Sequence, residues 1–343
     1  MLAKTLHLAR RPDATGEFAD EMFEMKESEL NEAADGEVIV RVDVLSCEPT
    51  QKVWVTDIVQ YMPAVAIGAP MRTIFGGTVL ASKHPDWKVG ERATGFGVWS
   101  SHLKANPQVS GWTKVPESSS LELAVACVLC PTTAYIGLHQ HGKILAGETL
   151  FVNGAAGAVG SAVVQMGKAA GARVIASAGG PEKCAYVKSL GADECIDYKS
   201  EDIAARLEKL CPGEIDVMFD NVGGSQLDAA LGQARNFARF VICGSISDYA
   251  KLGTGAAPVG PKNFGRILMR RITVRGFIAF DDAEWVAKAA ADVPQMIKDG
   301  RLKVDMDPVV APLEKAPEVW RNLLKGSNTG KLLHVINKAP AAN

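Results

Sequence analysis

Long unbroken apolar runs are missing from this sequence of 343 residues. No segment reaches the roughly 18 consecutive apolar residues that cross a bilayer. The first residues, MLAKTLHLARRPD, lack the uninterrupted apolar centre of a secretory signal. An excess of positive charge is missing too, because 37 Lys and Arg stand against 39 Asp and Glu and give a net charge of −2. We therefore expect neither a membrane nor a nucleic acid as a partner.

Cysteines are few and scattered. The seven stand at positions 47, 127, 130, 184, 195, 211 and 243, an odd number without the density of a disulfide framework. A reducing, cytoplasmic location is the simplest expectation. Only Cys127 and Cys130 lie close together, and no second pair or histidine ligand set accompanies them. We expect this pair to pack in a core and not to bind zinc.

The length favours two domains, because one hydrophobic core rarely organises more than about 300 residues. Hydrophobic residues make up 47% and charged residues 22%, which is the usage of a globular protein. Residues 36–120 read as short alternating or β-branched runs between turn residues, and this pattern predicts a β-rich domain. The C-terminal tail is too short for a domain of its own, so we expect it to pack onto the β-rich domain.

After Pro116 apolar strands alternate with helices. The predicted strands are 149–153, 173–178, 216–220, 239–244 and 272–277, and the predicted helices are 158–170, 182–190 and 226–236. A further helical stretch carries apolar residues on one face between Trp285 and Ile297, which we expect in the core. This alternation predicts an α/β domain with a parallel sheet and right-handed crossovers.

The strongest motif is a glycine-rich loop between a predicted strand and a predicted helix. It reads TLFVNGAAGAVGSAVVQMGKAAGARVIAS, and its spacing G-x-x-G-x-x-G departs from the standard G-x-G-x-x-G. A strand, a tight turn and a helix N-terminus are the context in which a dinucleotide pyrophosphate binds. The residues expected to contact the cofactor here are Gly154, Ala156, Gly157, Ala158, Val159 and Gly160. The alternative is a helix start whose glycines occur by chance.

The next strand favours NADPH over NADH. It ends at Ser177-Ala178 and continues as Gly179-Gly180-Pro181-Glu182-Lys183, so no carboxylate stands at its tip to hold the ribose hydroxyls of NAD. The small residues, Gly180 among them, leave room for a 2'-phosphate, and Lys183 is placed to neutralise it. The alternative for Lys183 is an ordinary exposed helix lysine.

Several strings in sequence order carry a family resemblance across nearly the whole chain. They are TAYIGL, NGAAGAVGS, AGGPEKC, ADECIDYK, FDNVGG, ICGSISDY, RGFIAFD and NTGKLLHVI. With them the chain resembles the zinc-independent medium-chain dehydrogenase/reductases, in the branch of the leukotriene dehydrogenase/prostaglandin reductases and 2-alkenal reductases. The resemblance implies a GroES-like, β-rich catalytic domain over residues 1–125, completed by 312–343. It also implies a Rossmann NADP-binding domain, a doubly wound parallel sheet, over 126–311.

The resemblance also implies site residues. It puts Lys183 and Tyr198 near the 2'-phosphate, and Asn221 and Asn328 near the nicotinamide end. Backbone contacts to the nicotinamide ribose and ring are implied for Gly244, Ser245, Phe277 and Ile278. Tyr249 follows the tyrosine of the substrate cleft and is the catalytic candidate. Its alternative is a loop tyrosine that packs on its own strand.

One string departs from the family pattern. The related reductases mostly read Ser-x-Asp-Pro-Tyr-Met-Arg, whereas this chain has Thr50 at the tyrosine position, within residues 46–52. Substrate preference should therefore not be copied from prostaglandins or leukotrienes. Tyr61 is a candidate to supply an aromatic edge to the cleft instead, and a core or rim tyrosine is the alternative.

Zinc ligands are absent from the positions where zinc alcohol dehydrogenases of the superfamily carry them. Cys47 stands alone near the first position, GGTVLAS occupies the Gly-His-Glu region, and residues 96–113 contain no cysteine. We expect no metal, and without a Lewis acid the favoured chemistry is reduction of a conjugated double bond. The prediction is NADPH-dependent reduction of α,β-unsaturated ketones or aldehydes, with hydride going to the β-carbon. A quinone reductase and an NADPH-binding scaffold with little turnover are the alternatives, and a homodimer is a weak expectation.

Overall fold

The computed structural model describes residues 1–13, 15–249, 251–256 and 259–337. The chain forms two compact units. The β-rich unit holds residues 1–128, 251–256 and the segment from 306 onward, and the α/β unit holds the rest of the chain. The junction falls inside helix α2 (Leu121–Tyr135). The domain limits after residues 125 and 311 that the sequence suggests lie close to these boundaries and remain a proposal.

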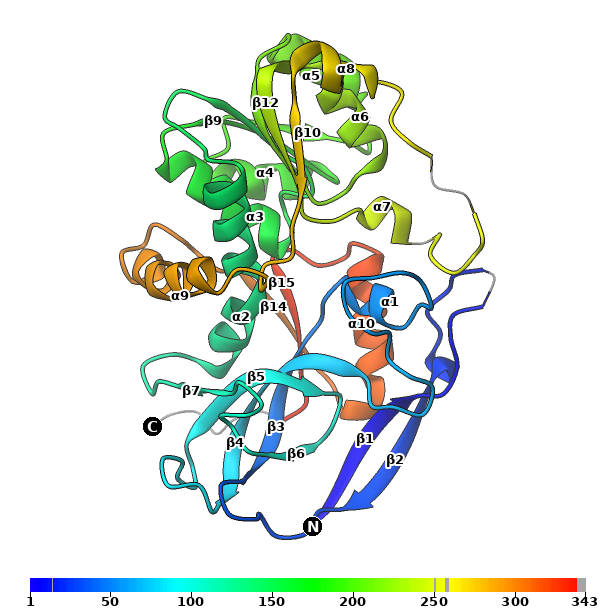
Figure 1. Cartoon of the computed structure of the whole chain (residues 1–343), viewed down its shortest axis with the longest axis vertical. Helices are drawn as coiled ribbons and strands as arrows, with labels where there is room; N and C mark the ends of the chain where they lie inside the picture. The colour runs from blue at the N-terminus through cyan, green and yellow to red at the C-terminus, as the bar shows by residue number, and fades with distance from the viewer. Residues whose placement is uncertain (14, 250, 257–258, 338–343) are drawn as a thin grey trace. The chain divides into compact units, whose positions relative to one another are not determined.

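The β-rich unit contains a mixed sheet with the order β14-β15-β3-β4-β5-β7, to which β6 adds by pairing with β3, and a β1-β2 hairpin (Figure 1). The strands are β1 (Leu2–Leu8), β2 (Phe23–Glu29), β3 (Val38–Ser46), β4 (Arg72–Ser82), β5 (Arg92–Val98), β6 (His102–Ala105), β7 (Thr113–Val115), β14 (Met306–Val310) and β15 (Lys331–Val335). The helices include α1 (Gln51–Trp54) and α10 (Ala316–Leu324). Since β15 pairs antiparallel with β3, the tail completes this sheet, as the sequence predicted.

Buried contacts fasten the C-terminal segment to the loop after β3. Trp320 is fully buried and packs on Phe18 with ring centroids 3.8 Å apart. Its indole Nε1 donates a hydrogen bond of 2.8 Å to the carbonyl of Glu48. The Glu48 carboxylate forms a buried ion pair of 2.5 Å with Lys331, whose Nζ also donates to the Cys47 carbonyl. Breaking such a pair on one side leaves an uncompensated buried charge, so these contacts hold residues 47–48 in place.

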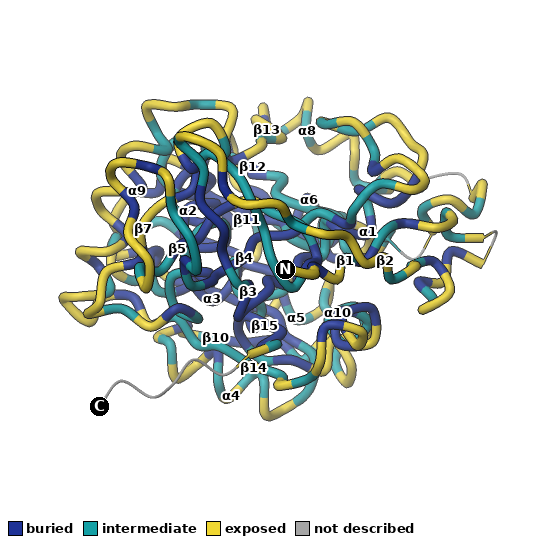
Figure 2. Tube along the Cα trace, turned by 90° about the horizontal axis from the view of Figure 1, so that it is seen from below, coloured by how far each residue is buried: buried dark blue, intermediate teal, exposed yellow. Residues whose placement is uncertain are grey.

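The α/β unit contains a parallel sheet with the order β10-β9-β8-β11-β12-β13. Its strands are β8 (Thr149–Val152), β9 (Arg173–Ala178), β10 (Glu194–Asp197), β11 (Ile215–Asp220), β12 (Ala234–Ile242) and β13 (Thr273–Gly276). The helical segments are α3 (Ala158–Ala169), α4 (Pro181–Ser189), α5 (Ile203–Leu210), α6 (Gly224–Gly232), α7 (Ile246–Tyr249), α8 (Gly265–Arg270), α9 (Ala283–Lys298) and a π-helical turn (Ile136–His141) that continues α2. Counted along the unit, the strand order is 3-2-1-4-5-6, the doubly wound Rossmann order. Figure 2 shows buried backbone along the central strands and mostly intermediate or exposed backbone in the loops.

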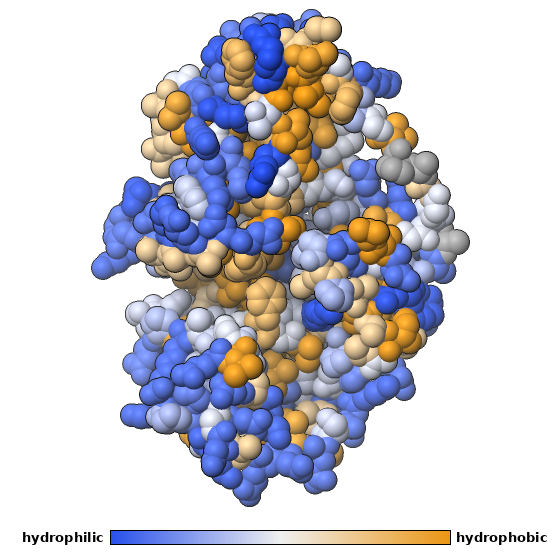
Figure 3. Space-filling model, viewed as in Figure 1, coloured by the Kyte–Doolittle hydropathy of each residue, from blue (hydrophilic) through white to orange (hydrophobic). Residues whose placement is uncertain are grey.

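Strand β13 is an edge of this sheet. Within the described residues it pairs with β12 alone, and all four of its residues are exposed. Val274 on β13 and Leu268 and Met269 on the adjacent α8 are 44%, 75% and 67% exposed. Figure 3 shows hydrophobic atoms gathered on the end of the α/β unit where Figure 1 places α8. The unit therefore presents an unpaired strand edge with apolar side chains beside it.

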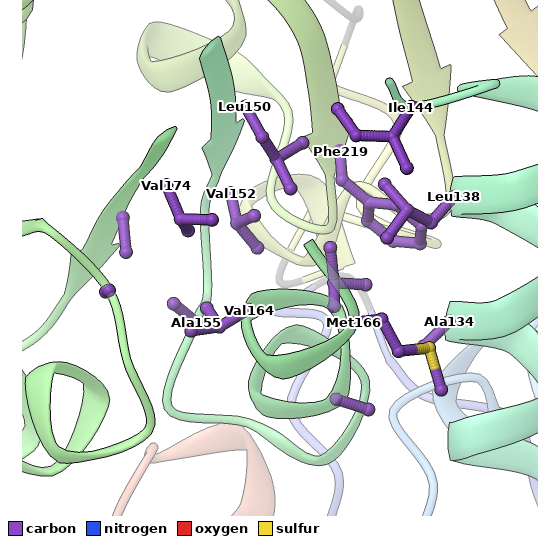
Figure 4. Packing of buried hydrophobic residues seen from close by; sticks show 14 of the residues in the cluster. Ala134, Leu138, Ile144, Leu150, Val152, Ala155, Val164, Met166, Val174 and Phe219 are labelled. Carbon is purple, nitrogen blue, oxygen red and sulfur yellow. The ribbon is translucent and has the colours of Figure 1, made fainter. Parts of the chain in front are cut away.

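Successive apolar side chains of each central strand point to opposite faces of the sheet, and they build one core on each face. Leu150 and Val152 of β8 face the helices α2, α3, α4 and α9, whereas Phe151 between them faces α5, α6 and α8. Figure 4 shows the first of these cores, with Val164 and Met166 of α3 among its members. Because both faces are covered by helices, the strands read as nearly continuous apolar runs.

Two differences from the sequence expectations have local causes. The predicted helix 226–236 is wrong in its last turn, because α6 ends at Gly232 and β12 starts at Ala234. Ala234 pairs with Ile215 of β11 and is buried, so sheet pairing overrides helix propensity there. Strand β10 was not predicted, because with four residues and two buried apolar side chains it offers little periodicity.

One described helical segment, 121–141, is long and apolar enough to cross a membrane by length and composition, with a hydropathy of 1.7. This differs from the sequence reading, which counted unbroken apolar runs and stopped at interruptions such as Glu122 and Thr132. In the structure, 61% of the most apolar window is buried within the protein, as expected for the core helix of a globular protein. The absence of a membrane partner stays a prediction.

Candidate active site

The two central strands of the parallel sheet end side by side. Leu150 to Val152 of β8 are in register with Val217 to Phe219 of β11. This is the point where the strand order reverses, and in open α/β sheets ligands bind in the crevice beyond the carboxyl ends of such strands. The glycine-rich loop follows β8 and the FDNVGG segment follows β11, so the fold brings these two predicted segments to one edge.

The glycine-rich loop has the backbone form of a phosphate cradle. Gly154 has a φ of +58°, in the left-handed region that favours glycine. A Cβ on Gly160 would lie 2.4 Å from the Gly154 carbonyl oxygen, so only glycine lets the helix approach the turn so closely. A Cβ on Gly157 would meet only the Gly154 carbonyl oxygen, at 3.3 Å, and would otherwise point into open space. That open side of the loop is the room that a pyrophosphate needs.

The N-terminus of α3 adds donors to this cradle. Gly157 is its N-cap, and no side chain caps the helix. The amides of Ala158, Val159 and Gly160 lie in the first turn, where helix geometry provides no intrahelical acceptor. These amides and the positive end of the helix dipole favour an anion on the open side of the loop. The residues present therefore fit the dinucleotide that the sequence predicts.

A buried polar network joins the loops after β8 and β11. Asn153 donates from Nδ2 to Oδ1 of Asp220 over 2.5 Å. The Asn221 amide N–H donates to Asn153 Oδ1 over 2.6 Å, and Asn221 Nδ2 donates to the Asn153 carbonyl over 2.8 Å. The predicted nicotinamide contact of Asn221 stays a prediction, because its side-chain N–H is here bonded to the neighbouring loop.

Asp220 is the centre of this network and was missed by the sequence analysis, although it lies in FDNVGG. Its Oδ1 also accepts from the amides of Val222 and Gly223, over 3.0 and 2.8 Å. The side chain is fully buried, its Oδ2 has no partner among the described residues, and burial raises the pKa of the carboxyl group. A polar residue that ends an otherwise apolar strand was the signal that could have identified it.

The loops that follow β9 and β10 carry the residues expected to bind the 2'-phosphate. Gly180 is the N-cap of α4 with a φ of +101°, and its amide donates to Asp197 Oδ1 over 2.7 Å. This hydrogen bond, with others from Ser200 and the Lys199 amide, lowers the pKa of Asp197. The Asp197 carboxylate thereby fixes the glycine turn, a role that the sequence analysis did not anticipate.

Candidate phosphate ligands surround that turn. Lys183 lies in the first turn of α4 and is half-buried. The Tyr198 hydroxyl oxygen would stand 2.6 Å from a Cβ on Gly179, and Lys199 Cε would stand 3.1 Å from it. Lys199 thus reaches the same turn as Tyr198 and is a candidate that the sequence analysis missed. Its position directly after Tyr198 in the string IDYK was the available signal.

The segment after β12 carries the next predicted residues. The amides of Cys243 and Gly244 donate to the Asp220 carbonyl over 2.8 and 3.1 Å. Tyr249 ends the short α7 and is half-buried. Its hydroxyl oxygen lies 3.8 Å from the place of a Cβ on Gly244, so Tyr249 and Gly244 with its neighbour Ser245 lie close together.

Phe277 and Ile278 follow β13. The Phe277 ring is 5.0 Å from that of His141 and 6.4 Å from that of Phe219, so its side chain is used in packing. The backbone contact to a cofactor that the resemblance implied for Phe277 stays a prediction. Ile278 is 36% exposed.

Two further candidates, Tyr61 and Asn328, belong to the β-rich unit. The Tyr61 hydroxyl is hydrogen-bonded to Thr50 Oγ1 over 2.6 Å and accepts from Trp54 Nε1 over 2.7 Å. Asn328 is buried, and its Nδ2 donates to the Gly330 carbonyl over 2.9 Å. The structure thus joins Tyr61 to Thr50, the residue at which the sequence departs from the family pattern.

The described residues contain no group of three or more His, Cys, Asp and Glu side chains placed to hold a metal ion. Cys130 is buried and Cys127 is half-buried, and neither forms a disulfide bond. Burial raises the pKa of Cys127 to about 12, and that of Cys47 also to about 12. The metal-free state stays a prediction that rests on the missing ligands in the sequence.

Comparisons with known proteins cover both units. A family model described as "Zinc-binding dehydrogenase" matches residues 158–294, and one described as "N-terminal domain of oxidoreductase" matches residues 4–115. The NADPH-dependent curcumin reductase of Escherichia coli (strain K12) is 34% identical over 336 residues, which are 95% of this chain and 94% of that protein. Prostaglandin reductase 1 of Oryctolagus cuniculus is 33% identical over 322 residues, 92% of this chain and 89% of that protein. The crystal structure of CurA in complex with NADPH from Vibrio vulnificus has a TM-score of 0.89 and 34% identity, and the match covers 98% of this chain and 100% of that one.

Gly157→Val is expected to abolish dinucleotide binding and leave the protein folded, because the new side chain enters the open side of the loop. Equilibrium binding by fluorescence titration and thermal melting measure the two effects. Gly265→Val is the matched control, since a Cβ there meets nothing within 4 Å. Loss of cooperative melting in Gly157→Val would show instead that this glycine serves packing.

Lys183→Ala is expected to raise the KM for NADPH about 10- to 150-fold, because a charge-assisted bond to the 2'-phosphate is lost. The KM for NADH should hardly change, since NADH lacks that phosphate. Steady-state kinetics with both cofactors test this, with Lys188→Ala on the same helix, ion-paired with Glu194, as the control. An equal loss for both cofactors would rule out the phosphate contact.

Proposed function

Because this chain belongs to the medium-chain dehydrogenase/reductase family, in the zinc-independent branch of the prostaglandin and 2-alkenal reductases, we propose that it reduces the carbon–carbon double bond of α,β-unsaturated ketones or aldehydes. It is an NADP-dependent oxidoreductase and uses NADPH. The observation that supports the proposal most is the similarity to a curcumin reductase over 95% of the chain. The glycine loop with the unfilled space beside Gly157 agrees with it.

NADPH, when bound, supplies the hydride that goes to the β-carbon of the substrate. The residues of this chain that would hold it are the first-turn amides of α3, at the pyrophosphate, and Lys183, Tyr198 and Lys199, at the 2'-phosphate. Asp220 and Asn153 keep the two central loops in a fixed arrangement. The reaction adds one hydride and one proton across the double bond, so it also needs a proton donor at the α-carbon.

Tyr249 is the side chain that we propose as this donor or as a hydrogen-bond partner of the enolate oxygen. Its hydroxyl lies beside Gly244 at the end of β12, one strand from the switch point of the sheet. Water is the competing donor, because an enolate in an open cleft is accessible to solvent. The two proton donors can be distinguished by turnover, which depends strongly on the Tyr249 hydroxyl if Tyr249 is the donor and weakly if water is.

The substrate class is tested by following NADPH oxidation with an enone, an enal and a quinone in parallel. We expect turnover with the enone and the enal, and unchanged activity after dialysis against a chelator. Faster turnover with the quinone would favour the quinone reductase alternative, since quinones present the same conjugated acceptor. Tight NADPH binding without any acceptor-dependent oxidation would favour a scaffold.

We also propose a cytoplasmic location and a homodimer. None of the seven cysteines forms a disulfide bond, as expected in a reducing compartment. A two-fold axis beside β13 would pair this edge with its copy and cover Val274, Leu268 and Met269. These apolar residues and the unpaired edge support a second copy of the chain as the partner there.

Tyr249→Phe is expected to lower kcat by less than about tenfold if solvent supplies the proton, and by about 100- to 1000-fold if the phenol stabilises the developing oxyanion. We expect the smaller effect, because water is a competing proton donor. Steady-state kinetics measure it, and an unchanged NADPH dissociation constant is the control. A drop beyond 100-fold would assign the catalytic role to Tyr249.

A double variant, Leu268→Glu with Val274→Lys, is expected to convert the dimer to a monomer, because charges at the centre of the covered edge oppose its burial. Sedimentation velocity gives the mass, compared with 36.4 kDa for one chain. Val259→Lys, at a position that is 83% exposed, is the control for an added surface charge. Wild-type protein that sediments as a monomer would refute the homodimer.

A further inference from the structure

Three polar groups of the β-rich unit meet around one hydroxyl oxygen. Thr50 is the N-cap of α1, Trp54 is its last residue, and Tyr61 lies on the loop that follows. Tyr61 Oη is 2.6 Å from Thr50 Oγ1 and 2.7 Å from Trp54 Nε1. The Thr50 side chain does not cap α1, so the contact with Tyr61 is its described hydrogen bond.

In the group of Thr50, Trp54 and Tyr61, one hydroxyl proton is not used in a hydrogen bond within the group. Trp54 Nε1 can only donate, so the Tyr61 oxygen accepts its proton. The bond between the two hydroxyls uses one of their two protons, in whichever direction it runs. One O–H proton, from Thr50 or from Tyr61, therefore remains without an acceptor in the group. The base of the group is buried and its tip is exposed, since Trp54 is 3% exposed whereas Tyr61 is 48% exposed, so a ligand at the exposed tip can accept this proton.

The loop that carries Tyr61 is held in position on both sides. Gln60 donates from Nε2 to the carbonyls of Val53 and Thr56, both over 3.2 Å. Arg72 donates from its guanidinium to the Pro63 carbonyl over 2.7 Å. These bonds fix the Tyr61 loop against α1 before any ligand arrives. A donor that is fixed in advance gains more from a developing negative charge than a mobile one.

We propose that the Thr50–Tyr61 hydroxyl pair is a specificity-determining donor that binds the carbonyl oxygen of the substrate, with Trp54 as its positioning residue. The proposal rests on the proposed function, which supplies the substrate class. Tyr61 thereby provides the phenol that the family pattern has at the position of Thr50. Because the pair offers a single proton, it recognises an acceptor oxygen and leaves the hydrocarbon end of the substrate to other contacts.

The double variant Tyr61→Phe with Thr50→Val is expected to lower kcat/KM for an enone about 10- to 100-fold, as for a lost hydrogen bond to an oxygen that gains charge. Each single variant should lose less, because it keeps one hydroxyl whose proton is no longer used within the group. Thr50→Ser should keep the activity, since it keeps the hydroxyl. Thr50→Tyr should restore activity to Tyr61→Phe by returning the phenol to the position of the family pattern.

The matched control is Tyr135→Phe, which removes a phenol that donates to Asp292 in the α/β unit and should leave kcat/KM unchanged. The dissociation constant of NADPH should not change in any of these variants. A double variant of Thr50 and Tyr61 that stays within about twofold of the wild type would overturn the inference and leave the proposed function standing.

A binding measurement separates this inference from the proposed function. Calorimetric titration of the NADP-loaded protein with a saturated ketone should give weaker binding in the double variant Tyr61→Phe with Thr50→Val than in the wild type, by about tenfold. If the wild type turns over no enone and this difference is present, the proposed function fails and the carbonyl site stands. If the ketone binds both proteins equally, the carbonyl site is refuted.

Discussion

The carboxylate and carbonyl of Asp220 join the ends of three strands in the α/β unit. Oδ1 accepts from Asn153 after β8 and from Val222 and Gly223 after β11, and the carbonyl oxygen accepts from Cys243 and Gly244 after β12. A buried carboxylate is costly unless donors surround it, so the loops that supply these donors must close around it. The shape of the sheet edge at which the dinucleotide is expected therefore depends on one residue that need not touch the ligand.

The sequence predicted the parts of this site that are local. The glycine loop could be identified because strand, turn and helix follow each other within a few residues, and the structure gives Gly154 and Gly160 backbone roles of the expected kind. The hydrogen bonds of Asp220 and the approach of Lys199 to Gly179 join segments distant in sequence, and no periodicity encodes them. The end of α6 was misjudged for the same reason, because pairing of Ala234 with Ile215 is decided by the sheet.

At Thr50 the chain lacks the phenol of the family pattern, but Tyr61 brings a phenol to the same residue from elsewhere in the sequence. A tyrosine at position 50 would carry its phenol at the start of α1. Here the phenol belongs to Tyr61, on a loop eleven positions later, and its hydroxyl is hydrogen-bonded to Thr50. The loop needs its own supports for this, from Gln60 and Arg72. An alignment column read alone would record a lost tyrosine, although the hydroxyl is still present beside it.

The burial of the thiols has a consequence for the lifetime of the enzyme. Conjugated enones and enals alkylate thiolates, so a protein that admits them risks inactivation by its own substrate. Burial raises the pKa values of Cys47, Cys127 and Cys243 to about 12 and that of Cys211 to about 11. At neutral pH only about one in 10⁴ to 10⁵ of a thiol with such a pKa is the reactive thiolate, compared with a few per cent of an exposed one. The same packing that buries these four thiols thus protects them from alkylation by the substrates that we propose.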